Sequence, residues 1–219
     1  MPALRLRCRG GRWQGLCWRL VNGQLPPVVP PGLRTTHFQA QSNNGETHMA
    51  ISMYQASVPV FTKMMNAVSH VIDKAEAHCA AKKIDPQALL TFRLYPDMFP
   101  LSRQFGIATV FGSSCPARLA GAEILAYDDK EASFADWKAR IKRTVEFAES
   151  FKPAQIDGSE DKDIKLTVAG NPVTLKGQPY LTHFALPHFF FHCATAYDIL
   201  RHNGVEVGKR DYLGKVPGM

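Results

Sequence analysis

Hydrophobic residues recur every three or four positions over most of the chain after residue 53, which is the period of an amphipathic helix. From Met53 to Ala81 the period is unbroken and predicts one long helix. The same period predicts helical structure in four further segments, at 85–92, 97–125, 133–151 and 187–202. Glycine or proline inside two of these helices predicts a bend or a split, at Pro59, Gly106, Gly112 and Pro116.

Local signals predict where the helices begin and end. Ser133 and Asp136 have the spacing of a capping box, and Asp97 is placed to cap the helix that follows it. Pro187 suits the first turn of the last helix, because a proline lacks the N–H that would be unpaired there. Gly204 suits the left-handed position after the last turn. A coil is expected from residue 208 to the end.

Between the last two long helices the pattern changes to period two. Hydrophobic residues alternate with polar ones over 164–175, on both sides of a turn at 170–172, which predicts a small β-hairpin. Four long helices of this kind need a shared core. We therefore predict an all-α fold, an up-down four-helix bundle with a small β-hairpin before the last helix.

Residues 1–48 differ from the rest in composition and carry most of the net charge. They are rich in Arg, Gly and Pro, and their six arginines against one acid, Glu46, supply +5 of the net charge of +7. Three interpretations stay open: a transit peptide, a disordered tail, or an extension upstream of a true start at Met49 or Met53. The predicted division is an N-terminal extension, disordered or mis-assigned, at 1–48, and a bundle domain at 49–219.

Composition narrows the possible partners and the compartment. The remaining charge of +2 over the bundle argues against a nucleic-acid surface, and no apolar run reaches the roughly 20 residues of a membrane span. The five cysteines are an odd number without a Cys-x-x-Cys pair, which predicts reduced thiols. We expect a cytoplasmic protein, or a mitochondrial one if residues 1–48 are a transit peptide.

Two histidines in the last predicted helix are the best candidates for a metal site. His188 and His192 are four residues apart, so both imidazoles leave one face of the helix. Most catalytic metals need a third protein ligand, and the candidates are Gln104, Asp97, His70 and Asp128. The alternative is that His188 caps the helix start while His192 forms a hydrogen bond inside the bundle.

Three further residues are candidates for catalysis. Asp97 and Gln104 are seven residues apart, which places them on one face if both lie in the same helix. Tyr197 and Arg201 are four residues apart and share a face of the last helix. Each also has a structural interpretation: Asp97 as a cap, and Gln104 as a hydrogen bond between helices. The chain has no glycine-rich phosphate loop, nucleophile elbow or dinucleotide fingerprint.

Several motifs together resemble a known family. They are PDMFPL at 96–101, ARLAG at 117–121, ALPHFFFH at 185–192 and AYDILRHNGVEVGKRDYLG at 196–214. With the Phe134-x-x-Trp137-x-x-Arg140 spacing, they resemble the domain of unknown function 1993 family, which is similar to the DinB/YfiT-like four-helix bundles. The resemblance covers roughly residues 53–214.

The resemblance implies a possible chemistry. DinB-like proteins often hold a metal by three histidines, one from the second helix and two from the last, and act as thiol transferases or hydrolases. His192 matches a family histidine, whereas His188 stands where the family has Asn, and 97–125 contains no histidine. The resemblance supports a metal ligand at His192 alone. The helical spacing adds His188, so we predict a divalent metal (Zn, Ni or Fe) at His188 and His192, with Asp97, Gln104 and Tyr197 as candidate catalytic residues from their spacing.

Two hypotheses about function follow. One is a metal-assisted enzyme acting on an unknown small molecule by thiol transfer or hydrolysis. The other is a non-catalytic bundle without metal that binds a small ligand or dimerises. Phe189, Phe190 and Phe191 cannot share one side of a helix. One ring must therefore face another element or a second chain, which favours a homodimer.

Overall fold

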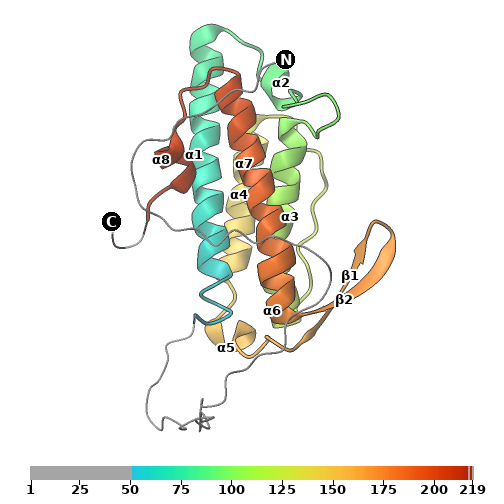
Figure 1. The fold of residues 1–219 in the computed structure, drawn as a ribbon. Helices are drawn as coiled ribbons and strands as arrows, with labels where there is room; N and C mark the ends of the chain where they lie inside the picture. The colour runs from blue at the N-terminus through green and yellow to red at the C-terminus, as the bar shows by residue number, and fades with distance from the viewer. Residues whose placement is uncertain (1–50, 217, 219) are drawn as a thin grey trace, which may run out of the picture. The chain divides into compact units, whose positions relative to one another are not determined.

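The computed structural model describes residues 51–216 and 218, so the predicted extension at 1–48 lies outside the described residues. The four long helices lie side by side and form the predicted bundle (Figure 1). They are α1 (Val58–Lys82), α3 (Leu101–Ala120), α4 (Phe134–Glu149) and α7 (Leu186–His202). The shorter elements are α2 (Pro86–Leu90), α5 (Pro153–Ile156), β1 (Asp163–Val168), β2 (Asn171–Lys176), α6 (Gly177–Pro179), the π-helical segment η1 (Tyr180–Ala185) and α8 (Lys209–Leu213).

Aromatic side chains from all four long helices meet in the core. The rings of Phe61 on α1 and Phe189 on α7 lie 4.7 Å apart in an edge-to-face arrangement. Phe105 on α3 packs against Trp137 on α4 at 5.8 Å. All four side chains are buried, and each such burial stabilises the fold by about 1.5–3 kcal/mol.

The first long helix begins later than its hydrophobic period suggests. Residues 53–57 form turns, and α1 starts at Val58. Pro59 therefore falls in the first turn, where its missing N–H interrupts no helical hydrogen bond.

The prediction that Asp97 caps the next long helix is wrong. The N-cap of α3 is Pro100, and Asp97 lies exposed in the connection before it. A proline at 100 disfavours helical backbone at Phe99, so a helix cannot start at Asp97 and pass through this point. At its other end α3 stops at Ala120, because Gly121 adopts a left-handed conformation with φ of 75°.

The sequence predicted a bend or a split at Gly106, Gly112 and Pro116, but α3 is not split and runs without interruption with Pro116 inside it. Both glycines lie on the side of α3 that faces α4. A Cβ at Gly106 would lie 3.5 Å from the Trp137 ring, and one at Gly112 would lie 3.2 Å from Thr144. The distance at Gly106 is an ordinary contact, so Gly112 alone of the two lies where α4 leaves little room for a side chain, and neither glycine breaks the helix.

The capping box and the hairpin are present as predicted. The Ser133 hydroxyl accepts the Asp136 N–H at 3.2 Å, and the Asp136 carboxylate accepts the Ser133 N–H at 2.9 Å. β1 and β2 pair antiparallel. Their turn is Ala169-Gly170, with φ of 48° and 83°, one residue before the predicted position.

The last helical segment starts ten residues earlier than predicted. α6, η1 and α7 follow one another without a break from Gly177 to His202. The π-helical turns come just before Pro187, which has no N–H to donate to the preceding turn. The helix ends at the predicted place, where Gly204 has φ of 82°.

The expected coil after residue 208 contains a further short helix, α8. It packs mainly beside α1 (Figure 1), and it also contacts α7 through the rings of Tyr212 and Tyr197. Among the described residues, no helix is both long enough and apolar enough to cross a membrane.

Candidate functional site

His192 and Gln104 form a buried pair that joins α7 to α3. The Nδ1 atom of His192 lies 2.7 Å from the Oε1 atom of Gln104. The Gln104 amide nitrogen donates to the carbonyl of Phe99 at 3.0 Å, so the amide oxygen is the acceptor for the histidine. His192 therefore carries its hydrogen on Nδ1 and leaves Nε2 as an acceptor. This is the hydrogen bond between helices that the sequence offered as a role for Gln104.

The environment of His192 keeps its imidazole neutral at physiological pH. Burial, and to a smaller extent the nearby side chains of His188 and Arg103, lower the pKa of His192 from 6.5 to about 4. A neutral imidazole with a fixed tautomer can accept a hydrogen bond or bind a cation at Nε2. It is a weak proton acceptor at pH 7.

His188 lies one turn away on the same helix but in a different environment. It is exposed, and its ring stacks on Phe111 of α3 at 5.1 Å with an interplanar angle of 16°. The Phe184 ring lies 4.5 Å from it. His188 thus belongs to an aromatic contact across α3 and α7, and it does not cap the helix.

The other predicted site residues lie elsewhere. Asp97 is exposed ahead of α3, so the helix face that it was expected to share with Gln104 does not exist. Tyr197 packs edge-to-face on Tyr212 of α8 at 5.7 Å. His70 on α1 pairs with Asp211 of α8 at 3.3 Å. Asp128 is exposed in the connection from α3 to α4.

These positions do not fit a catalytic metal centre with three protein ligands. Within residues 51–216 and 218, no three His, Cys, Asp or Glu side chains lie close enough together to hold an ion. Gln104 already accepts from one ring nitrogen of His192 and donates to Phe99. The donor set near His192 is therefore limited to the two histidines of α7, and we derive no chemical step through a metal.

Arg140 of α4, which the sequence pattern indicated only as part of a motif, is a buried charged residue and only 4% exposed. Its guanidinium donates to the carboxylates of Asp129 at 2.7 Å and Glu131 at 3.0 Å. Its Nε donates to the Thr109 hydroxyl at 2.8 Å, and it lies over the ring of Tyr127.

These contacts attach the connection between α3 and α4 to both helices. The sequence did contain a signal for the burial of Arg140. Phe134, Trp137 and Arg140 recur every three positions, which places Arg140 on the apolar face of this helix. An arginine on such a stripe is buried and needs charged partners.

The fold and the residues along it define the chain as a DinB-like four-helix bundle. A solved structure of a DinB family member from Shewanella denitrificans is similar over 75% of this chain and 93% of that chain. The sequences are 38% identical and the TM-score is 0.68. No curated protein matches the chain.

A comparison with models of protein families places the sequence in one family. The model of the domain of unknown function 1993 (DUF1993) family matches residues 53–213. The chain therefore belongs to the DUF1993 family, as its motifs indicated.

Proposed function

We propose that this protein is a non-catalytic, metal-independent bundle that forms a homodimer through the outer face of α3 and α7. We call this surface the aromatic face and define it by six residues: Phe99, Val110, Phe111, Phe184, His188 and Phe191. The observation that carries the proposal is the exposure of Phe191 in the middle of α7, at 55%. Phe99 is exposed as well, at 52%, and exposed large apolar side chains grouped on one face mark interaction surfaces.

The three consecutive phenylalanines of α7 take different environments. Phe189 is fully buried in the core, Phe190 is half-buried, and Phe191 points outward. Successive residues of a helix are about 100° apart, so one ring had to leave the core. The outward ring supports a partner on this side.

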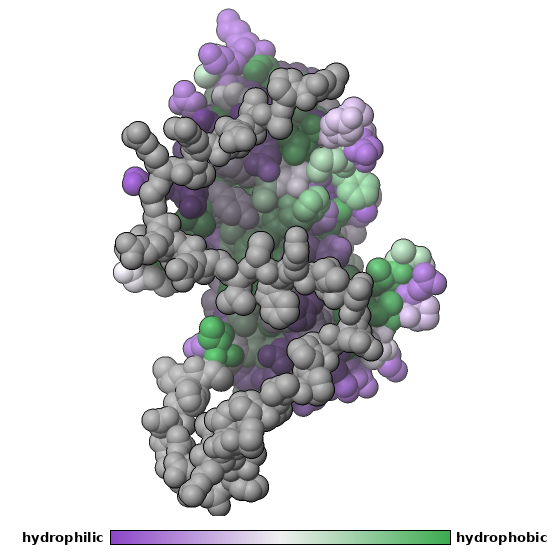
Figure 2. All heavy atoms as spheres, viewed as in Figure 1, coloured by the Kyte–Doolittle hydropathy of each residue, from purple (hydrophilic) through white to green (hydrophobic). Residues whose placement is uncertain are grey.

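The aromatic face has members at both ends of the contact between α3 and α7. At one end, Phe111 packs against both Phe184 and His188. At the other end, the Phe99 side chain is 52% exposed, and Phe191 contacts His192. Figure 2 shows hydrophobic residues exposed on the side of the molecule that carries α7 and α3.

A second copy of the chain is the partner that this surface suits. In a twofold dimer the same patch serves both chains, and such dimers are the commonest oligomers. Arg103 is the charged residue beside Phe99, with its guanidinium 5.9 Å from that ring. Stacking on an aromatic ring allows an arginine to lie within an interface.

The metal-assisted alternative, thiol transfer or hydrolysis at His188 and His192, needs a third ligand beyond these two side chains. The Gln104 bond and the stacking of His188 on Phe111 give both histidines a structural role. We also propose a reducing, cytoplasmic location, which is supported by free, buried thiols at Cys79, Cys115 and Cys193. Cys8 and Cys17 lie outside the described residues.

The oligomeric state of the full chain tests the proposal. Light scattering coupled to size exclusion should give a dimer for the wild type and a monomer for Phe191→Asp. Leu213→Asp is the matched control, because Leu213 is 37% exposed on α8, which packs against α1. This control should stay dimeric, and circular dichroism should show folded helices in all three proteins. A monomeric wild type, or a Phe191→Asp dimer as stable as the wild type, contradicts the proposal.

A further inference from the structure

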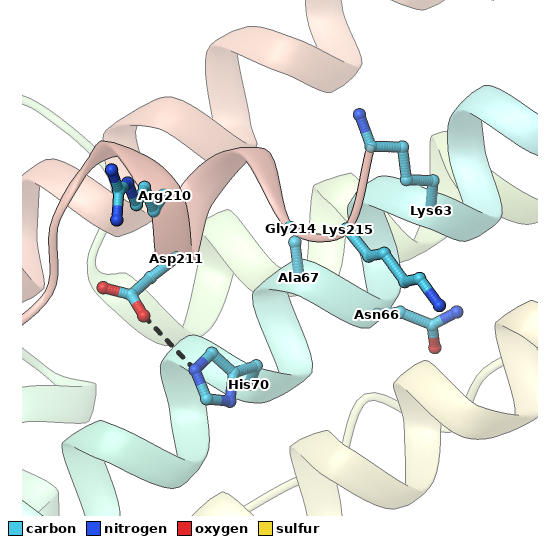
Figure 3. Close-up of a pocket in the computed structure, with 8 residues that line it drawn as sticks. All are labelled: Lys63, Asn66, Ala67, His70, Arg210, Asp211, Gly214 and Lys215. Atoms are coloured by element: carbon cyan, nitrogen blue, oxygen red, sulfur yellow. Dashed lines mark hydrogen bonds and ion pairs between the residues drawn. The ribbon is translucent and has the colours of Figure 1, made fainter. Parts of the chain in front are cut away.

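A cavity of about 460 Å³ lies between α1 and the C-terminal segment, away from the aromatic face (Figure 3). Its polar lining comes from two parts of the chain that are far apart in sequence. The α1 residues are Lys63, Asn66 and His70, and the C-terminal residues are Arg210, Asp211 and Lys215. Ligand sites for small molecules have volumes of about 300–1,000 Å³.

A close backbone contact positions the C-terminal segment on α1. Gly214 has φ of 62°, and a Cβ there would lie 3.0 Å from the Cβ of Ala67. Only glycine combines this left-handed conformation with so close an approach. The two residues form the apolar part of the lining, between the charged side chains that Figure 3 shows on either side.

The one acidic residue of the lining is already paired with a lysine and a histidine of α1. The Asp211 carboxylate lies 2.7 Å from the Lys74 ammonium and 3.3 Å from the His70 ring. It also accepts the N–H of Gly208 at 2.7 Å. These contacts hold the pKa of Asp211 below its usual value, and they attach α8 to α1.

The remaining cations of the lining have no such compensation. In the part of the chain that the structure describes, Lys63, Arg210 and Lys215 have no carboxylate within 4.0 Å. Lys215 extends toward Asn66, whose amide can also donate to a ligand (Figure 3). Figure 3 shows these cations at different sides of the lining, with Arg210 beyond Asp211 and the two lysines on the side of Asn66. Uncompensated positive charges around one cavity raise its affinity for an anion.

We propose that this cavity binds a small organic phosphate. The ammonium groups of Lys63 and Lys215 match a phosphate in charge, and the exposed Arg210 side chain, once turned toward the cavity, can donate to two of its oxygens at once. The Asn66 amide supplies a neutral donor. The organic part of the ligand would lie on Ala67, Gly214 and the methylene stems of the lysines. The site is independent of the aromatic face, because it is built on α1 and α8.

The test is a titration of the full chain with phenyl phosphate, followed by NMR or calorimetry, with benzoate and phenol as parallel ligands. Phenyl phosphate should bind saturably, at least about tenfold more tightly than benzoate, whereas phenol should show no saturable binding. The double variant Lys63→Gln/Arg210→Gln should weaken phenyl phosphate binding at least about tenfold. Both side chains lie at the surface, and neither forms an ion pair with a described residue that the fold would lose.

The matched control is Lys142→Gln, an exposed lysine on α4. It should leave the phenyl phosphate affinity within about twofold of the wild type. Three results would overturn the proposal: no saturable binding of phenyl phosphate up to about 10 mM, equal affinity in the double variant, or tighter binding of benzoate. The oligomeric state of the double variant, measured alongside, separates this site from the proposed dimer.

Discussion

The guanidinium of Arg140 lies 3.9 Å from the centre of the Tyr127 ring, inside the protein. The Tyr127 hydroxyl in turn lies 2.8 Å from the Thr144 hydroxyl on α4. With Asp129 and Glu131 on the guanidinium, the connection between α3 and α4 is attached to the bundle by one buried charge. A cation held by two carboxylates and an aromatic face is compensated, so its burial is tolerated.

Replacing Arg140 with methionine should destabilise the fold strongly. The change removes every partner of Asp129 and Glu131 on α4 and should lower the free energy of unfolding by about 2–4 kcal/mol. Urea denaturation of the full chain measures the loss. Lys142→Met, at an exposed position of the same helix, should change stability by less than about 0.5 kcal/mol. If both variants lose equally little, Arg140 is not a stabilising centre.

The bond between Gln104 and His192 should give a measurable coupling energy. Gln104→Leu leaves the Nδ1–H of His192 buried without an acceptor, which should cost about 1–3 kcal/mol. His192→Leu and the double variant complete the cycle, and the double variant should be more stable than the sum of the single losses predicts. Additive losses would mean that the two side chains do not interact in solution.

The stability of the protein should depend on the protonation of His192. The folded state holds the pKa of His192 near 4, below the value of 6.5 for an exposed histidine. The unfolded state therefore binds the proton first as the pH falls. The contribution of His192 is fully present above about pH 6.5 and is lost progressively toward pH 4.

A pH series of urea denaturations measures this loss. Between pH 7 and pH 4.5, the wild type should lose up to roughly 2 kcal/mol more than His192→Gln, which cannot titrate in this range. Parallel pH profiles for the two proteins would show that His192 is not buried in its neutral form.

Two glycines should respond in opposite ways to replacement by alanine. At Gly106 an added Cβ meets only the Trp137 ring at 3.5 Å, an ordinary contact, so Gly106→Ala should stabilise α3 by about 0.5–1 kcal/mol. At Gly177 the Cβ would lie within 1.9 Å of the Ser159 carbonyl oxygen, so Gly177→Ala should lower the melting temperature. Gly106→Ala should therefore melt at a higher temperature than Gly177→Ala, and the reverse order would contradict the distances at both glycines.

Metal analysis separates the proposed metal-independent bundle from the metal-assisted hypothesis. Full-length protein without a histidine tag, incubated with zinc and then desalted, should retain less than about 0.1 ion per chain. His192→Gln should give the same value. About one ion per wild-type chain, lost in His192→Gln, would establish a metal site and return thiol transfer or hydrolysis to consideration.

Local signals in the sequence were enough to predict the helices and several of their ends. Ser133 and Asp136 cap α4 as expected, and Gly204 ends α7, because both effects involve only neighbouring backbone groups. The predicted cap at Asp97 is wrong, because Pro100 disfavours helical backbone at the residue before it and α3 starts only after Pro100. The predicted coil after residue 208 is also wrong, because α8 has only five residues, too few to show the hydrophobic period of a helix.

At the candidate site, the positions of the two histidines follow from local helix geometry, but their partners follow from tertiary packing. The spacing of His188 and His192 placed both on one face of α7, which the helix geometry alone determines. Whether they act together depends on the facing helix. There Gln104 holds His192 while Phe111 stacks on His188.

The sequence by itself determined the class of fold, the order of the helices and the outward position of one ring among Phe189, Phe190 and Phe191. Only the tertiary structure decided the partners of Arg140 and the cavity between α1 and α8. The physical reason is distance along the chain. Helical period and capping depend on residues a few positions apart. Ala67 and Gly214, the apolar part of the cavity lining, are in contact although they lie near opposite ends of the bundle domain's sequence.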